Sequence, residues 1–333
     1  MYPKNVKRAV AHLLERKVPV FLWGPPGIGK SSIVAQIAKE KNIGFIDLRL
    51  SLLDPTDLRG IPFFDSQNSE AIWAKASFLP DGKQEKGILF LDELNTAAPM
   101  VQASAYQLIL DRKIGEYSLP DGWSIMAAGN REGDRGVVFR MAAPLANRFV
   151  HLDMQTNIED WKAWAIGANI DATIIAFITY RPDALFAFST NSDSKAFATP
   201  RTWEYVNEIL ESNPEDDLLQ DMISGSIGEE LASAFLGFRS VSSHLPDIEA
   251  ILDGTCKEVP IELSALHILC TALSLRVDDE TRSSELNNLL TYTLELPAEF
   301  AIMIVEDLRN REIGLDYLKS WALWVRKFNK ILH

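Results

Sequence analysis

The sequence predicts an α/β fold, a parallel sheet sandwiched by helices, followed by an all-helical region. Three observations predict it. A glycine-rich phosphate-binding loop lies between a strand and a helix, and a buried strand ends in two carboxylates. After residue 153, the alternation of strands and helices gives way to helices alone. Together they indicate a nucleotide-binding α/β core with a helical addition.

The first of these features, residues 24–31, fits the pattern G-x-x-x-x-G-K-[ST]. The apolar segment 18–23 precedes it, and residues 32–38 follow with apolar side chains at helical spacing. Such an arrangement aims backbone N–H groups and a helix N-terminus at one anion, which argues against a chance glycine-rich turn. The residues expected to hold the phosphates are Gly24, Pro25, Pro26, Gly27, Ile28, Gly29, Lys30, Ser31 and Ser32.

The chemistry of the site is expected from four side chains. Lys30 supplies a positive charge for the β- and γ-phosphates, and Ser31 supplies a hydroxyl for Mg²⁺. Residues 87–93 are an apolar run of strand length that ends in Asp92 and Glu93, at the ligand-binding edge of an open α/β sheet. We expect Asp92 to hold Mg²⁺, directly or through water, and Glu93 to orient or deprotonate the attacking water. The alternative is that both carboxylates cap the next helix.

Composition limits the class of protein. The chain has 333 residues, of which 47% are hydrophobic, and no apolar run approaches the roughly 20 residues of a membrane span. Its net charge of −13 argues against general nucleic-acid binding, although a basic pore can be hidden in the total. Cys256 and Cys270 form neither a metal pattern nor a disulfide framework, so we expect buried thiols and a cytoplasmic location.

The rest of the chain supplies the boundaries. Further strands are expected at 43–50, 124–130 and 149–152, and helices begin near 157, 199 and 261. Thr199 suits an N-cap and Pro200 the first helical position. We therefore expect a nucleotide-binding core at 1–153, a helical lid at 154–238 and a further helical region at 239–333.

This ordered set of motifs resembles the AAA+ ATPases over roughly residues 4–235. The resemblance implies that Asn130 is sensor 1, which positions the attacking water, and that Arg201 is sensor 2, on the lid. It also implies that Arg148 is an arginine finger acting on a neighbouring copy, with Arg140 and Arg135 as alternatives. Each of these residues also has a plain structural interpretation: a strand end for Asn130, a surface ion pair for Arg148 and packing against Trp203 for Arg201.

Two predicted hairpins narrow the resemblance to the MoxR branch, whose relatives include magnesium-chelatase motor subunits. One spans residues 57–76, and the other runs through 113–119, turns at 120–122 and continues into 123–125. The resemblance implies ATP and Mg²⁺ as cofactors, a homo-oligomeric, hexameric ring, and an adaptor with a von Willebrand factor A domain. Phe63, Phe64 and Trp73 are either client contacts or core residues.

Two other function classes remain open at this point. One is an AAA+ motor acting on nucleic acid, either clamp-loader-like or restriction-associated, which the acidic balance disfavours. The other is a scaffold that binds ATP without turning it over, against which Glu93 argues. The region after about residue 240 could cap the lid, bind the adaptor or tune the size of the ring.

Overall fold

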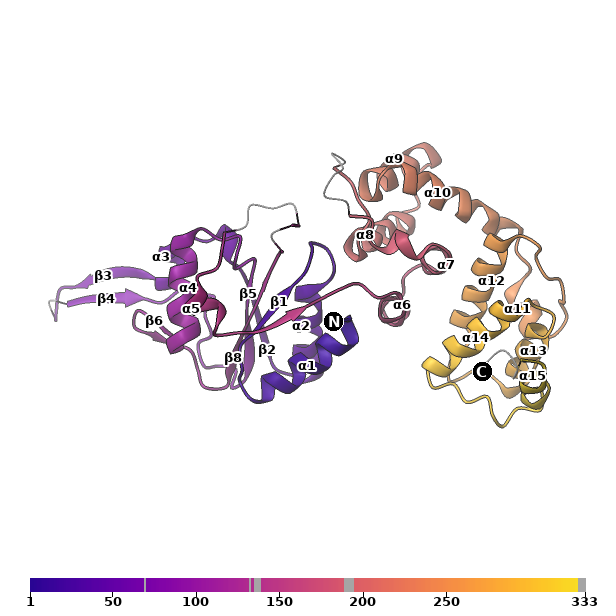
Figure 1. The fold of residues 1–333 in the computed structure, drawn as a ribbon, viewed down its shortest axis with the longest axis horizontal. Helices are drawn as coiled ribbons and strands as arrows, with labels where there is room; N and C mark the ends of the chain where they lie inside the picture. The colour runs from indigo at the N-terminus through magenta and orange to yellow at the C-terminus, as the bar shows by residue number, and fades with distance from the viewer. Residues whose placement is uncertain (69, 132, 135–138, 189–194, 329–333) are drawn as a thin grey trace. The chain divides into compact units, whose positions relative to one another are not determined.

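The computed structural model describes residues 1–328 except residues 69, 132, 135–138 and 189–194 (Figure 1). The chain forms two compact units, the first comprising residues 1–160 and the second beginning at Trp161. The three-part division predicted from the sequence, with boundaries at 153 and 238, stays a prediction.

The first unit is built on a parallel five-stranded sheet with the strand order β2-β5-β8-β1-β9. The strands are β1 Val20–Trp23, β2 Gly44–Arg49, β5 Gly87–Asp92, β8 Trp123–Gly129 and β9 Val150–Asp153. Each lies within two residues of a strand that the sequence predicts, so the predicted fold class is confirmed. Because the central strands are buried on both faces, they are continuous apolar runs.

Helices cover both faces of this sheet (Figure 1). They are α1 Pro3–Glu15, α2 Lys30–Glu40, α3 Pro55–Arg59, α4 Pro99–Asp111 and α5 Ala143–Ala146. On one face, Leu89 and Leu91 of β5 share an apolar cluster with Val101 and Leu108 of α4. The first residues of β5 and β8 pack closely against each other, because a Cβ on Gly87 would lie 2.7 Å from the indole of Trp123.

A hairpin projects from this unit (Figure 1) and consists of β3 Ile61–Asp65 and β4 Glu70–Ala74. Its large apolar side chains are exposed: Phe63 by 57%, Phe64 by 73% and Trp73 by 39%. Apolar side chains with that much exposure do not pack in a core. Of the two interpretations of these aromatic residues, core packing within this chain is therefore wrong.

The second predicted hairpin, between residues 113–119 and 123–125, is wrong, and a shorter hairpin lies within residues 113–118. The hairpin pairs β6 Lys113–Ile114 with β7 Tyr117–Ser118, and its turn contains Gly115 at a φ of +54°. Residues 120–122 instead form a turn, closed by Trp123 N–H donating to the Pro120 carbonyl, that leads into β8. The prediction failed because residues 123–129 pair with both β5 and β1 in the central sheet.

The remaining helices run from α6 to α15. They are α6 Ile158–Gly167, α7 Ala172–Tyr180, α8 Pro200–Glu211, α9 Asp216–Ile227, α10 Glu229–Ser240, α11 Ile248–Leu252, α12 Leu263–Arg276, α13 Ser283–Thr293, α14 Ala298–Asn310 and α15 Trp321–Phe328. Phe177, Trp203 and Phe235 form one aromatic core across α7, α8 and α10. A second core joins α11 to α15. None of the described helices is long and apolar enough to cross a bilayer.

Both cysteines lie in the second unit as free thiols. Cys270 lies on α12 and is buried in the core that joins α11 to α15. This burial raises the pKa of its thiol to about 12. Cys256 is only half-buried. The prediction of buried thiols is therefore confirmed for Cys270, which packing makes unreactive.

Candidate nucleotide site

The predicted phosphate loop joins β1 to α2 in the first unit. Gly27 and Gly29 have φ angles of +79° and +91°, a region that L side chains rarely adopt, and Gly29 is the N-cap of α2. A Cβ on Gly24 would lie 2.5 Å from Ile28 Cδ1 and 3.1 Å from the Met154 carbonyl oxygen. Two of these glycines are thus required by backbone conformation and one by close packing. The loop ends where the first N–H groups of α2 are free of intrahelical partners, as anion binding requires.

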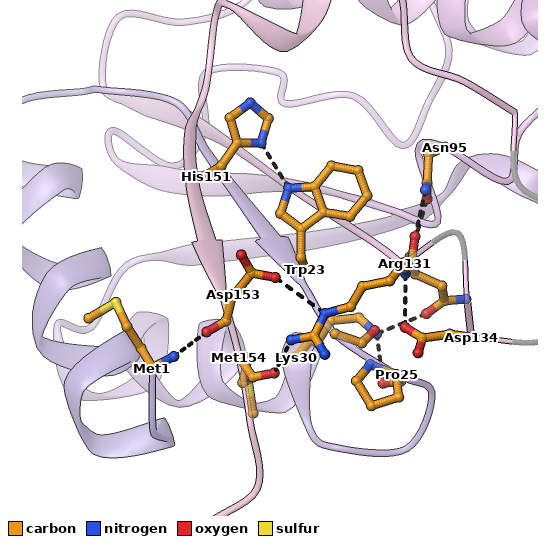
Figure 2. Close-up of polar contacts among 12 residues, drawn as sticks. Met1, Trp23, Pro25, Lys30, Asn95, Arg131, Asp134, His151, Asp153 and Met154 are labelled. Atoms are coloured by element: carbon orange, nitrogen blue, oxygen red, sulfur yellow. Dashed lines mark hydrogen bonds and ion pairs between the residues drawn. The ribbon is translucent and has the colours of Figure 1, made fainter. Parts of the chain in front are cut away.

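Lys30 brings the loop together with the end of β8 (Figure 2). Its Nζ donates to the carbonyl oxygens of Gly24 at 2.6 Å and Pro25 at 3.0 Å, and to Asn130 Oδ1 at 3.0 Å. The two residues that the sequence predicts as phosphate ligand and sensor 1 therefore meet, although 100 positions separate them. Ser31 and Ser32 lie in the first turn of α2, directly after Lys30.

Asn95 fixes the backbone of Asn130. Its Nδ2 donates to the Asn130 carbonyl at 2.7 Å, and its Oδ1 accepts from the Asn130 N–H at 3.2 Å (Figure 2). Asn95 is 1% exposed, and a Cβ on Gly129 would lie 2.1 Å from Asn95 Oδ1. Sequence reasoning missed this role. Two features of the sequence could have indicated it: an amide side chain two positions after the carboxylate pair, and a glycine directly before Asn130.

Asp92 ends β5 opposite Arg49 of β2. The pKa of the Asp92 carboxyl is raised above its ordinary value, mainly because the group is buried. The hydrogen bond from the Glu93 N–H and the charge of Lys30 act in the opposite direction, whereas the negative charge of Glu93 raises the pKa further. The pKa of Asp47, on β2, is also raised by burial and then by the charge of Asp92. Asp92 Oδ1 accepts from the Glu93 N–H at 2.9 Å. A buried carboxylate of this kind gains most from a bound cation.

Glu93 has an unusual backbone and two side-chain neighbours from β2 and the segment after it. Its φ is +56°, which is uncommon for a residue with a side chain and is found at functional sites. Ser51 Oγ donates to Glu93 Oε2, and Arg49 Nε lies 3.8 Å from Glu93 Oε1. Sequence reasoning did not single out Ser51 or Arg49, because nothing in the spacing shows which residues of β2 face β5 across the edge.

Neither carboxylate caps the following helix. The N-cap of α4 is Ala98, with no side-chain hydrogen bond, and the Thr96 and Ala97 N–H groups donate to the backbone carbonyl of Glu93. The capping alternative for Asp92 and Glu93 is therefore wrong. The carboxylates of Asp92 and Glu93 are therefore available at the sheet edge where Lys30 and Asn130 also lie.

Of the three arginines considered as the finger, Arg148 and Arg140 are among the residues that the structure describes. Arg148 lies between α5 and β9 with an exposed side chain, and its guanidinium has no hydrogen-bond or ion-pair partner within the part of the chain that the structure describes. Arg140 is also exposed. Arg135 lies outside the described residues. The assignment of Arg148 as the arginine finger stays a prediction.

Arg201 is exposed in the first turn of α8, in the second unit. Thr199 caps that helix by accepting from the Thr202 N–H, and Pro200 is its first residue, as the sequence predicts. Trp203 points into the aromatic core of α7 and α10, so it is buried while Arg201 is not. The role of Arg201 as sensor 2 stays a prediction.

Arg131 joins the end of β8 to the end of β9, beside the loop (Figure 2). Its Nε donates to Asp153 Oδ1 at 3.2 Å, and its Nη2 donates to the Met154 carbonyl at 3.1 Å. The Met154 carbonyl is the backbone group nearest to a Cβ on Gly24. Arg131 thus holds the backbone against which the first glycine of the loop packs, a role that the sequence did not reveal.

Part of this unit is similar to a known protein family. Residues 19–149 match the family model described as the AAA domain of the dynein-related subfamily. Within this segment, the loop, the carboxylate pair and the strand that precedes Asn130 follow one another in the order that the resemblance to AAA+ ATPases implies. The match covers the strands β1 to β8 and ends before β9.

The curated relatives are distant. The chain is 27% identical over 188 residues to midasin from Giardia intestinalis, covering 53% of this chain and 4% of midasin. It is 24% identical over 248 residues to the outer mitochondrial transmembrane helix translocase from Rattus norvegicus, covering 71% of this chain and 66% of the relative. The chain thus spans less than two thirds of the length of either protein.

Among solved structures, similar chains include a RuvB variant from Thermotoga maritima, with a TM-score of 0.41 and 19% identity over 84% of each chain. NtrX from Brucella abortus in complex with ATP has a TM-score of 0.39 and 14% identity, covering 93% of this chain and 68% of that one.

Proposed function

We propose that this chain is the subunit of a ring-forming, hexameric ATPase whose active site is completed by a neighbouring copy. The observation that carries the proposal is the meeting of Lys30 and Asn130 at 3.0 Å, at the same sheet edge as Asp92 and Glu93. The exposed Arg148 supports the second half of the proposal, because its guanidinium is directed to solvent rather than to a side chain of the described chain.

Each residue of the edge has a task in ATP hydrolysis. Lys30 and the N–H groups at the start of α2 bind the phosphates. Glu93, held by Ser51, accepts a proton from the attacking water or orients it. Asn130, held by Asn95, fixes the position of that water. Arg148 of a neighbouring copy and Arg201 of the second unit neutralise the charge that develops on the γ-phosphate.

Mg²⁺ fits the donor set of this edge. Among the described residues, no group of three or more His, Cys, Asp or Glu side chains could hold a metal by itself. Ser31 and Asp92 supply one hydroxyl and one carboxylate, and Mg²⁺ characteristically takes few protein ligands and completes its shell with phosphate and water oxygens. When bound, Mg²⁺ neutralises phosphate charge. The buried Asp92 gains a compensating charge from it.

The MoxR type, with a von Willebrand factor A domain adaptor, is the subclass that we favour. Two hairpins support it: the exposed one of β3 and β4, and the short one of β6 and β7 directly before β8. Phe63, Phe64 and Trp73 would then contact the client or the adaptor. Hydrolysis would move the lid bearing Arg201 against the core, and the hairpins would pass that motion on.

A motor acting on nucleic acid is the second candidate, because the first unit does not share the acidic excess of the whole chain. The acidic excess of the chain lies after residue 160, where 27 Asp and Glu face 14 Lys and Arg, whereas residues 1–160 carry 19 of each. The bulk charge therefore does not exclude a nucleic-acid contact by the first unit. Salt-dependent binding of single- or double-stranded DNA that stimulates ATP hydrolysis would establish this alternative.

The experiment that tests the proposed activity compares ATP binding with ATP hydrolysis in the presence of Mg²⁺. Lys30→Ala should weaken binding of a fluorescent ATP analogue by roughly 10- to 100-fold. Glu93→Gln should bind the analogue normally and lose about 10²- to 10⁴-fold in rate. Glu85→Gln is the matched control, because Glu85 is exposed and remote from this edge. A wild type that binds ATP without hydrolysing it would instead support the scaffold function.

A further inference from the structure

The turn that carries Arg148 is held by its neighbours. Leu145 and Phe149 on either side are buried, at 2% and 8% exposure, whereas Arg148 is exposed. The Arg148 N–H donates to the Leu145 carbonyl at 3.1 Å, and the Phe149 N–H donates to the Ala146 carbonyl at 3.2 Å. The backbone of this turn is therefore fixed, and its orientation is set by whatever holds Ala146 and Phe149.

His151 holds that turn through one of its ring nitrogens. Its Nε2 lies 2.8 Å from the Ala146 carbonyl oxygen. Its Nδ1 lies 2.8 Å from Trp23 Nε1 (Figure 2). An indole N–H can only donate, so Nδ1 accepts. The neutral ring then carries its proton on Nε2, which donates to the Ala146 carbonyl. The two contacts thus fix the tautomer and leave neither nitrogen for another role.

Trp23 connects the same ring to the phosphate loop. It is the last residue of β1 and directly precedes Gly24. Its ring stacks on His151 with centroids 5.9 Å apart and an interplanar angle of 25°, and it packs on Phe21 at 4.2 Å. Phe21 in turn contacts Phe149 edge-on at 5.5 Å. A continuous set of contacts therefore runs from the residue before the loop to the residue after Arg148.

We propose that His151 is a positioning residue that ties the orientation of the Arg148 turn to the phosphate loop of the same chain. The inference rests on the proposed function, in which Arg148 serves the site of a neighbouring copy. A phenylalanine could provide the ring contacts with Trp23 and Phe21. Only a group that accepts from an indole N–H and donates to a carbonyl can bridge the two segments, which the neutral imidazole does here.

This arrangement gives His151 a testable signature. A defect in how Arg148 is presented harms the neighbour's site and spares the chain's own site. His151→Phe keeps the aromatic contacts and loses both hydrogen bonds, so the rate of ATP hydrolysis should fall about three- to tenfold for each lost bond. Its affinity for a fluorescent ATP analogue should stay at the wild-type value, because Lys30 and its partners are untouched.

The deciding experiment mixes variants in equal amounts with Lys30→Ala, which has a dead site and an intact Arg148. We expect His151→Phe to regain part of the lost activity in this mixture, as Arg148→Ala does. Trp23→Phe, which removes the indole donor and part of the ring, should behave like His151→Phe with a smaller loss. His12→Phe, on the exposed side of α1, is the control for a histidine substitution and should have the wild-type rate.

Two outcomes overturn the inference while leaving the proposed function in place. In the first, Arg148→Ala regains activity with Lys30→Ala but His151→Phe does not, so His151 acts on its own loop. In the second, His151→Phe has the wild-type rate. If Arg148→Ala also fails to regain activity, the shared site itself is wrong, and the role of His151 falls with it. Circular dichroism and analogue binding of His151→Phe establish that the variant is folded.

Discussion

Asn95 and Asn130 exchange two hydrogen bonds in which one side chain satisfies both backbone groups of the other residue. The Asn95 amide packs against the end of β8, where the absence of a Cβ on Gly129 leaves room for it. Asn130 in turn contacts Lys30. Asn95, which is buried and not expected to contact ATP, therefore sets the position of Asn130, which is expected to act in the ATP site.

Asn95→Leu should lower the rate of hydrolysis more than it weakens ATP binding. The substitution leaves the Asn130 N–H and carbonyl without partners, which should cost about 1–3 kcal/mol of folding free energy for a buried group. Loss of sensor alignment should reduce kcat about tenfold with little change in KM. Steady-state kinetics and urea unfolding check both values.

The matched control for this prediction is Asn310→Leu, at the exposed end of α14. It should change neither kcat nor the free energy of unfolding by a measurable amount. If Asn95→Leu raises KM while kcat stays constant, Asn95 supports nucleotide binding rather than the water-positioning side chain, and the assignment of Asn130 fails.

Asp92→Asn should stabilise the protein and impair its activity. Because burial raises the pKa of Asp92 in the folded state, the folded chain binds the proton more tightly than the unfolded chain does. Stability is therefore fully present below the ordinary pKa and is lost as pH rises from about 4 through the raised value. The asparagine does not ionise, so its advantage in unfolding free energy should grow over that window.

Denaturant unfolding of the wild type and Asp92→Asn at a series of pH values measures this difference. The same variant should require a higher Mg²⁺ concentration for hydrolysis, because a carboxylate oxygen is lost from the metal's surroundings. Equal stability of the two proteins across the whole range would contradict the raised pKa. Unchanged Mg²⁺ dependence would remove Asp92 from the metal site.

Ser51→Ala should lower the rate of hydrolysis about three- to tenfold by releasing the Glu93 carboxylate from its hydroxyl partner. ATP affinity should not change. The effect should disappear when Glu93 is already glutamine, because the two substitutions then act on one group. A double-mutant cycle of kcat with Ser51→Ala and Glu93→Gln tests this, and additive losses would show that Ser51 acts elsewhere.

Phe64→Ser and Trp73→Ser should leave folding and basal ATP hydrolysis intact. Both side chains lie on the exposed hairpin, so their removal should change the free energy of unfolding by no more than about 0.5 kcal/mol. Trp203→Ala, in the aromatic core of the second unit, is the contrasting variant and should cost about 3–5 kcal/mol. Thermal unfolding separates the two cases, and a large loss for the hairpin variants would mean that they pack in a core.

The strands and the loop could be predicted from the sequence because their signals are local. Alternating β and α segments, a glycine pattern and an apolar run that ends in carboxylates depend only on neighbouring residues. The turn of the short hairpin could not be predicted in the same way. Pro120 and Gly122 do form a turn, but the competition for residues 123–129 is decided by the central sheet.

The partners of the site residues depended on strand order, which no local pattern contains. Arg49 meets Glu93 because β2 lies beside β5, and His151 meets Trp23 because β9 pairs with β1 at the edge. The sequence places Asn95 two positions after Glu93 but does not show that it contacts Asn130. The sequence thus identified the residues expected to touch ATP, whereas the residues that hold them required the fold.

The central claim is that two copies share the site, and the rate of ATP hydrolysis per chain as a function of protein concentration tests it most directly. We expect the rate to rise with concentration and to level off where assembly is complete. Arg148→Ala should assemble over the same range and stay slow throughout. A rate per chain that is constant down to the lowest measurable concentration, with Arg148→Ala as fast as the wild type, would contradict the claim and indicate a self-contained site.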